Sequence, residues 1–176
     1  DQLLKKIAAD QFIVTSSNSH GVEKLQAKGL EARLADFNLI ESLNEAFKGI
    51  DKLLLISTMD QNRLNQHKNV IDAAKAQGVK HIVYTSLAIN DIETSGVKDL
   101  MISHFQTEDY IKESDIPYTI LRNTMYADAL TQILGPNVLT QSINLPGGNG
   151  KVPYALRREM GEGTANLLLQ DGHENK

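Results

Sequence analysis

The chain has 176 residues, a formal net charge of −4 and no cysteine. The absence of cysteine excludes disulfides, thiolate metal sites and cysteine nucleophiles, and it fits a cytoplasmic location. Lysine and arginine form no block and no apolar run approaches the length of a membrane span, so we predict neither a nucleic-acid partner nor a membrane protein. The length suits one domain, which we take to cover residues 1–176.

The N-terminal part of the sequence predicts helices that alternate with short strands. Residues 1–9 have the pattern of a helix with no capping sequence before it, and we therefore expect the protein to extend upstream. Strands are predicted at residues 12–15 and 32–34. Helices are predicted at residues 21–28 and at 38–47, the second of them capped by Asn38.

A strand, a helix and a second strand are predicted between residues 51 and 86. Residues 53–56 and 81–84 are unbroken apolar runs, which are typical of parallel strands covered on both faces. The helix between them covers residues 63–77 and ends at Gly78. Such a crossover leaves both strands parallel, so the polar residues that follow them should share one edge of the sheet. The first strand is followed by Ser57, Thr58, Met59 and Asp60, of which all but Met59 are polar, and the second strand is followed by Thr85 and Ser86.

The C-terminal half continues the alternation. A loop at 87–98 precedes a helix at 99–114 and a strand at 118–121. A brief helix from Tyr126, a strand at 138–142, a loop at 146–151 and a helix at 155–170 complete the prediction. The whole pattern predicts an α/β fold with a doubly wound parallel sheet, and the polar residues past five strand ends favour an extended ligand along one edge.

Four segments form a specific combination: residues 79–86, 104–108, 118–126 and 148–151. Together they resemble the NmrA-like group of atypical short-chain dehydrogenases, and within it the bacterial type-2 NAD(P)H:quinone oxidoreductases. The resemblance implies a Rossmann-like sheet of strand order 3-2-1-4-5-6. It also implies a first strand and a glycine-rich phosphate loop, which this sequence lacks. That strand would lie between those at Phe12 and Leu53, so we expect the chain to be a fragment of a longer protein.

The resemblance implies that a dinucleotide, NADP or NAD, lies across the strand ends. It places Asp36 and Phe37 beside the adenine, and Ser57, Thr58 and Met59 beside the ribose and pyrophosphate. It places Thr85 and Ser86 beside the nicotinamide, and Asn123, Thr124, Met125 and Tyr126 around the nicotinamide and the substrate. Alternatively, Asp36 is only a turn or cap residue and Tyr126 only a packed aromatic residue.

The choice between the two nucleotides stays open. Relatives that prefer NADPH carry an arginine just after the second strand of the sheet, and Ser17 stands at this position here. A serine brings no charge to pair with a 2′-phosphate, although His20 or Lys24 could supply some. No acidic residue stands there to reject the phosphate either.

The candidate catalytic residues are Tyr126, Ser86 and His104. Standard short-chain dehydrogenases use a tyrosine and a lysine four residues apart, and this sequence has no such pair. This argues against reversible alcohol oxidation and favours hydride transfer to a small quinone or similar electrophile, whose protons can come from water. The alternatives are a non-catalytic NAD(P)-binding redox sensor and an atypical reductase or isomerase for another small carbonyl compound.

The histidines do not predict a metal site. His104 and Glu108 are four residues apart on one helix, but no third ligand is evident, so we interpret them as a solvated pair. The resemblance nevertheless places His104 near the pocket. His67 and His81 are interpreted as structural or surface residues, and Arg157 and Arg158 as a surface pair at a helix start. The sequence leaves oligomerisation open.

Overall fold

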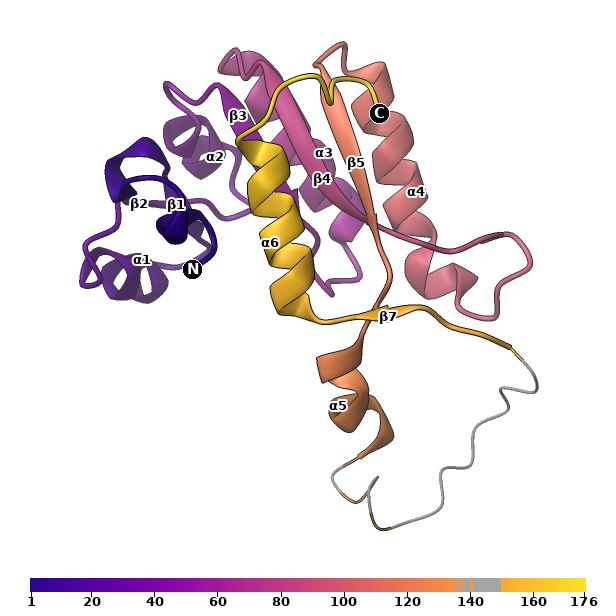
Figure 1. Ribbon diagram of the computed structural model, residues 1–176. Coiled ribbons are helices and arrows are strands. Elements are labelled where there is room, and N and C mark those ends of the chain that lie inside the picture. Colours follow the sequence, from indigo (N-terminus) through magenta and orange to yellow (C-terminus); the bar gives the residue numbers. More distant parts are fainter. Residues whose placement is uncertain (136, 138–139, 141–149) are drawn as a thin grey trace.

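The structure, a computed structural model, describes residues 1–135, 137, 140 and 150–176 (Figure 1). Within these residues the strands are β1 (Val14–Ser16), β2 (Ala32–Leu34), β3 (Lys52–Ile56), β4 (His81–Leu87), β5 (Tyr118–Asn123), β6 (Met125–Tyr126) and β7 (Tyr154–Ala155). The α-helices are α1 (Ser19–Gln26), α2 (Ile40–Ala46), α3 (Arg63–Ala76), α4 (Lys98–Glu113), α5 (Leu130–Leu134) and α6 (Arg157–Leu168). The short 3-10 helices are η1 (Leu3–Lys5), η2 (Ala9–Gln11) and η3 (Ala127–Ala129).

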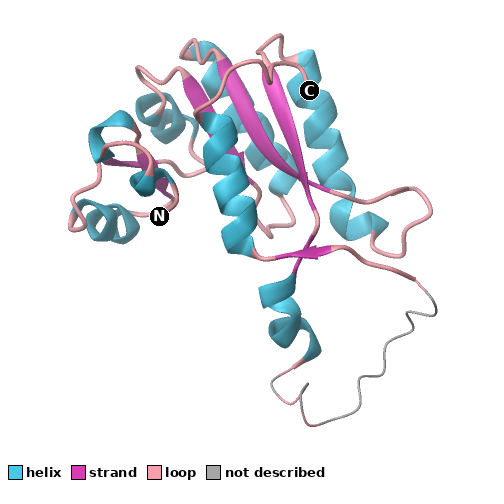
Figure 2. Cartoon of the chain, viewed as in Figure 1, coloured by secondary structure: helices cyan, strands magenta, loops and turns pink. Residues whose placement is uncertain are grey.

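Parallel strands form the centre of the molecule. β4 pairs with β3 on one side and with β5 on the other, and all three strands run in the same direction. β1 and β2 form a separate parallel pair, and β6 and β7 form another. Helices α3 and α4 cover one face of the larger sheet, while α6 crosses the other face (Figure 2). The predicted α/β architecture with parallel strands is confirmed.

The core lies between β3, β4 and the helices on one face of the sheet. Leu43 of α2, Ile71 of α3 and Ile111 of α4 are fully buried, and they pack in one cluster with Leu55 and Ile82. α3 ends where Gly78 adopts a φ of +74°, which glycine tolerates better than other residues. Gly78 therefore ends the crossover helix shortly before β4 begins at His81.

A cavity of about 640 Å³ separates β1 from β3. Phe12 and Val14 line it on one side, and Leu53 and Leu54 line it on the other. Among the described residues β1 pairs only with β2, and β3 pairs only with β4. Within the described part of the chain, β1 and β3 are therefore not paired with each other, and the cavity lies between them.

The structure corrects several predicted boundaries. Residues 1–9 form η1 and a turn instead of one helix, because no side chain caps the start and a short helix with few bonds is costly to nucleate. β4 continues to Leu87 and β5 to Asn123, because Ser86 still lies opposite Arg122 in the ladder. The predicted strand at 138–142 and the loop at 146–151 lie mostly outside the described residues. None of the helices in the described part is both long and apolar enough to cross a bilayer.

Truncation of a core side chain tests the packing of α3. We expect Ile71→Ala to lower the free energy of unfolding by about 2–5 kcal/mol, because Ile71 is fully buried. The control is Ile40→Ala, which removes the same atoms from a side chain that is 47% exposed and should change the free energy by less than about 0.5 kcal/mol. Urea unfolding followed by circular dichroism measures both. Equal losses in the two variants would contradict this account of the core.

Candidate functional site

The carboxyl ends of β3, β4 and β5 lie next to one another and form an edge that we call the rim. Ile56 at the end of β3 lies opposite Thr85 in β4, and Leu87 of β4 lies opposite Asn123 at the end of β5. Ser57 follows Ile56 directly. The structure therefore brings predicted site residues from three strands to one edge, which is the position where parallel sheets bind ligands.

Ser57 and Thr85 hold the ends of β3 and β4 together. The Ser57 hydroxyl donates to the carbonyl oxygen of Thr85 at 2.9 Å, and the Ser57 N–H donates to the Thr85 hydroxyl at 3.2 Å. The Ser57 Oγ atom also lies 3.1 Å from the Tyr84 hydroxyl. These bonds hold the backbone after β3 against β4 without the help of a ligand.

A buried polar cluster lies beneath Ser57. The Tyr84 hydroxyl is 3.0 Å from Nδ1 of His104, and Nδ1 of His67 is 3.0 Å from the Thr107 hydroxyl. The rings of His67 and Tyr84 meet edge-on with centroids 5.4 Å apart. Burial lowers the pKa of His104 to about 4 and that of His67 to about 3, and it raises the pKa of Tyr84. Both imidazoles are therefore neutral at pH 7 and act as hydrogen-bonding parts of the core.

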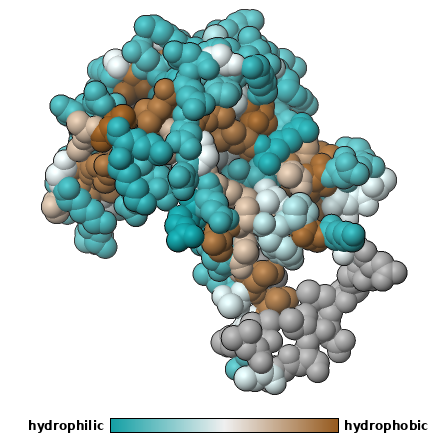
Figure 3. All heavy atoms as spheres, viewed as in Figure 1, coloured by the Kyte–Doolittle hydropathy of each residue, from teal (hydrophilic) through white to brown (hydrophobic). Residues whose placement is uncertain are grey.

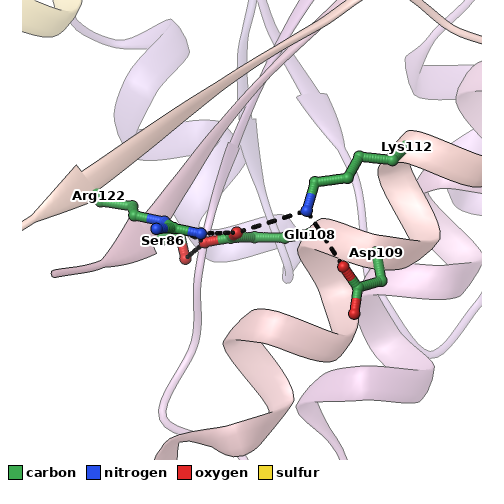
Figure 4. Close-up of polar contacts among 5 residues, drawn as sticks. All are labelled: Ser86, Glu108, Asp109, Lys112 and Arg122. Atoms are coloured by element: carbon green, nitrogen blue, oxygen red, sulfur yellow. Dashed lines mark hydrogen bonds and ion pairs between the residues drawn. The ribbon is translucent and has the colours of Figure 1, made fainter. Parts of the chain in front are cut away.

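A second cluster joins α4 to β4 and β5 (Figure 4). The carboxylate of Glu108, a residue that is 1% exposed, accepts from the Ser86 hydroxyl at 2.5 Å and from Nη2 of Arg122 at 2.7 Å. Nε of Arg122 also donates to Glu108 at 3.1 Å, and this hydrogen bond raises the pKa of Arg122. On the outer side of the cluster, Lys112 pairs with Asp109 at 3.1 Å. One buried carboxylate thus connects the ends of two neighbouring strands.

The prediction that His104 and Glu108 form a solvated pair is wrong. Both residues are buried, at 8% and 1% exposure. They face the sheet because polar partners on β4 and β5 satisfy them there, so burial leaves neither group without a hydrogen bond. The sequence leads to an interpretation of His67 and His81 as structural or surface residues, and their burial agrees with the structural interpretation.

Ser86 lies on the α4 side of β4 and is 4% exposed. Its hydroxyl is bonded to Glu108, so the structure gives it a role in holding the sheet to α4. Its predicted contact with the nicotinamide stays a prediction, as does the catalytic role of His104. Both side chains lie under the rim in this structure.

Sequence reasoning missed Arg63, the first residue of α3, which is 2% exposed. Its Nε donates to the carbonyl oxygen of Thr58 at 2.6 Å, and Nη1 donates to the Ser103 hydroxyl at 2.9 Å. Arg63 therefore ties the segment after β3 to α4. A basic residue in the first turn of a helix opposes the helix dipole, and this unfavourable position was the available signal.

The end of β2 is arranged around Asp36. Its carboxylate accepts from the backbone N–H of Asn38 at 2.9 Å and from the Asn38 side chain at 3.1 Å. This turn precedes α2 and agrees with the alternative interpretation of Asp36 as a turn residue. Phe37 packs against the core with its ring edge-on to His67, while Ser17 is exposed just before α1. Contacts of these residues with a nucleotide stay predictions.

β6 and β7 continue the rim beyond β5. Met125 lies opposite Tyr154, and the Thr124 hydroxyl donates to the carbonyl oxygen of Pro153. The Arg157 guanidinium lies 5.3 Å from the centre of the Tyr126 ring, which is consistent with a cation–π contact. Arg157 and Arg158 are both exposed at the start of α6, as predicted. Tyr126 is thus a partly exposed aromatic residue with one basic neighbour.

The residues of the rim fit a dinucleotide. Met59 is 76% exposed, so a flat ring could pack against it, and Asn123 supplies amide donors and acceptors. The first turn of α1 is capped by Asn18, whose side chain accepts from the backbone N–H of Gly21 at 2.8 Å. Within the described residues, no group of three or more histidine, aspartate and glutamate side chains is placed to hold a metal ion.

Comparison with known sequences decides the family. The model of a family described as NAD(P)H-binding matches residues 1–153, which include all the predicted site residues. The chain belongs to the NAD(P)H-binding family. It is 36% identical over 178 aligned positions to quinone oxidoreductase 2 of Escherichia coli K12, an alignment that covers all of this chain and 61% of that protein.

Two solved structures extend the comparison. One is the NADPH complex of the quinone oxidoreductase 2 from Escherichia coli, with a TM-score of 0.89 and 35% identity over 99% of this chain and 61% of that one. The other is the NADP(H) complex of a triphenylmethane reductase from a Citrobacter species, with a TM-score of 0.87 and 39% identity over 99% of this chain and 62% of that one. The chain thus spans about three fifths of the length of these relatives.

The Glu108 cluster can be tested by truncation. We expect Glu108→Ala to lower the free energy of unfolding by about 1–3 kcal/mol, because the buried Ser86 hydroxyl loses its acceptor and Arg122 its partner. The control is Asp109→Ala, the next residue, whose exposed pair with Lys112 should contribute less than about 1 kcal/mol. Urea unfolding at pH 7 measures both. A loss in Glu108→Ala no larger than in Asp109→Ala would remove the cluster from the account.

Stability should fall as the pH is lowered from about 6.5 to about 4. The pKa of His104 is lower in the folded protein than in the unfolded chain, so the unfolded state binds more protons within this range. His67 acts in the same direction. Urea midpoints measured across this range should depend less steeply on pH in His104→Gln. His20→Gln, which changes an exposed histidine, should retain the slope of the parent, and an unchanged slope in both variants would contradict the prediction.

Proposed function

We propose that the protein is an NAD(P)H-dependent oxidoreductase that transfers hydride to a small quinone or a similar electrophile. The observation that carries the proposal is the gathering of Ser57, Thr85 and Asn123 at one parallel edge, within a chain that belongs to the NAD(P)H-binding family. The names of two relatives support the substrate class, since one is called a quinone oxidoreductase and the other a triphenylmethane reductase. We also propose a cytoplasmic location, because the sequence has no cysteine and therefore needs no oxidising compartment.

A bound reduced nicotinamide would supply the hydride, and the residues of this chain would hold it and the acceptor in position. In the proposal, Thr85 and Asn123 bind the amide and ribose groups near β4 and β5, and the exposed side chain of Met59 covers one face of the nucleotide. Met125 and Tyr126 line the acceptor side, where both are more than one third exposed. Catalysis would come chiefly from holding the two reactants at close range, because a quinone accepts hydride without a strong acid.

A charge change at Ser17 tests the position of the nucleotide. We expect Ser17→Arg to improve the KM for NADPH relative to NADH by roughly tenfold, because a guanidinium can bind a 2′-phosphate through two hydrogen bonds. Ala27→Arg is the matched control, since it adds the same charge just after the other end of α1. Fluorescence titration with each nucleotide gives the corresponding Kd values. The same preference in both variants would place the 2′-phosphate elsewhere.

The reaction itself is tested by steady-state oxidation of NADH and NADPH with a panel of benzoquinones. Turnover with at least one quinone supports the proposal, and tight nucleotide binding with no turnover on any acceptor would favour the redox sensor instead.

Tyr126→Phe retains the ring and its contact with Arg157 but removes the hydroxyl. A loss of kcat at unchanged KM would give that hydroxyl a role in the chemical step, and unchanged kinetics would leave Tyr126 as a packing residue.

A further inference from the structure

Three polar side chains meet beneath the rim. The Tyr84 hydroxyl lies 3.1 Å from Oγ of Ser57 and 3.0 Å from Nδ1 of His104, and these last two atoms are 3.4 Å apart. Tyr84 is fully buried and His104 is 8% exposed, whereas Ser57 is partly exposed at the rim. We call these residues the Tyr84 cluster. It connects the rim with the interior of the protein.

The Tyr84 cluster lies on the face of the sheet that α3 and α4 cover. The Tyr84 ring meets His67 of α3 edge-on, and its centre lies 6.3 Å from that of the His104 ring on α4. Figure 3 shows the opposite face, where apolar side chains gather over the β1 and β2 region and beside α6. The cluster is therefore separate from that apolar surface.

The hydrogen atoms of the Tyr84 cluster can be arranged in two ways. In the first, Nδ1 of His104 donates to Tyr84, and Tyr84 donates to Ser57. Ser57 then donates to the carbonyl oxygen of Thr85 at 2.9 Å. In the second, Ser57 donates to Tyr84 and Tyr84 donates to Nδ1 of His104, whose own proton is on Nε2. Both arrangements leave every side chain neutral, so a proton that leaves Ser57 can be replaced along the cluster.

The inner end of the Tyr84 cluster is within reach of water. Nε2 of His104 has no hydrogen-bond partner within the described residues, yet it is not a fully buried atom, because the only fully buried and unpartnered side-chain atom there is Nε2 of His67. The proton of His67 is fixed on Nδ1, since the Thr107 hydroxyl donates to the carbonyl oxygen of Ser103 at 2.7 Å and must accept from Nδ1. Of these two histidines, His104 is the one that can exchange a proton with water.

We propose that Ser57, Tyr84 and His104 form a proton relay that carries one proton from water to the rim. The proposal rests on the proposed function, since a quinone that has received a hydride is an oxyanion that still needs a proton. The O–H bond of Ser57 breaks, and its proton goes to this oxyanion directly or through a water molecule. Ser57 takes the proton of Tyr84, Tyr84 takes that of Nδ1 of His104, and Nε2 takes one from water. The sum is one hydride and one proton added to a quinone, which gives a hydroquinone.

The surroundings keep the relay neutral between turnovers. Burial, aided by the charge of Arg63 on α3 and opposed by that of Glu108 on α4, lowers the pKa of His104 to about 4. Burial also raises the pKa of Tyr84, and the neighbouring imidazole of His67 is neutral with a pKa of about 3. The relay therefore stores no charge at pH 7, and a proton enters at one end as another leaves at the other.

The first test needs neither nucleotide nor acceptor. Protein labelled with nitrogen-15 in its histidines is studied by NMR at pH 7, because the shifts of the two ring nitrogens report which of them carries the proton. We expect His104, whose signals are identified by their loss in His104→Gln, to exchange between both tautomers. Tyr84→Phe removes the oxygen between the two partners and should leave one dominant tautomer of His104. A single tautomer in the unchanged protein, as expected for His67, would overturn the proposal.

The second test compares two acceptors that differ in their need for a proton. A benzoquinone takes up a hydride and a proton, whereas a cationic triphenylmethane dye becomes a neutral molecule with the hydride alone. We expect Tyr84→Phe to lower kcat at least about tenfold with the benzoquinone and to leave kcat with the dye within about twofold, at an unchanged KM for NAD(P)H. Ser57→Ala should behave in the same way, and Ser57→Thr, which retains a hydroxyl, should keep most of the quinone reaction.

Tyr110→Phe is the matched control. The Tyr110 hydroxyl donates to Asp72 at 2.8 Å, a contact between α4 and α3 that is exposed and apart from the relay. Its removal should leave both reactions as in the parent. Turnover with the dye also verifies that Tyr84→Phe remains folded.

Each remaining outcome has one meaning. Equal losses with the two acceptors in Tyr84→Phe would give the cluster a structural role alone, and an unchanged quinone reaction would equally overturn the relay. Where the parent accepts only one of the two compounds or neither, the histidine spectrum decides on the relay. Absence of all turnover by the parent would contradict the proposed function and not the relay.

Discussion

The pairing of β4 with a strand on each side is the constraint on which the rest of the structure depends. Ile82, Val83 and Tyr84 are completely buried, so every backbone group of this segment must find its partner within the protein. β3 and β5 supply those partners in parallel register. Because both faces of β4 are also apolar or internally bonded, helices cover the sheet, and its carboxyl edge is left for a ligand.

The polar residues at this edge are chiefly bonded to one another. The Ser57 hydroxyl donates to the carbonyl oxygen of Thr85, and the Ser86 hydroxyl donates to Glu108, so these hydroxyls stabilise the sheet and its contact with α4. Polar character at a strand end is therefore weak evidence of ligand contact when considered one residue at a time. The more informative residues are those that the sheet does not use, such as Met59 and Ser17, which are exposed at the ends of β3 and β1.

The sequence predicted those parts of the fold that depend on local pattern. The predicted bounds of β2 were correct, and those of α3 were correct to within one residue. The signals for α3, its helical period and the glycine at its end, lie within or next to the helix itself. The burial of Glu108 could not be predicted in this way. Its partners Ser86 and Arg122 are 22 and 14 residues away, and a spacing of four from His104 is the same whether a helix faces water or a sheet.

Arg63 has a mechanical consequence for the edge where a nucleotide is proposed to bind. Its guanidinium bonds at once to the segment after β3 and to α4, through Thr58 and Ser103, and it is almost wholly shielded from water. A shift of that segment would strip a buried cation of its acceptors unless α4 moved with it. The segment after β3 is thus coupled to the long helix behind the sheet, and adjustment to an incoming molecule falls to side chains such as Met59 more than to the backbone.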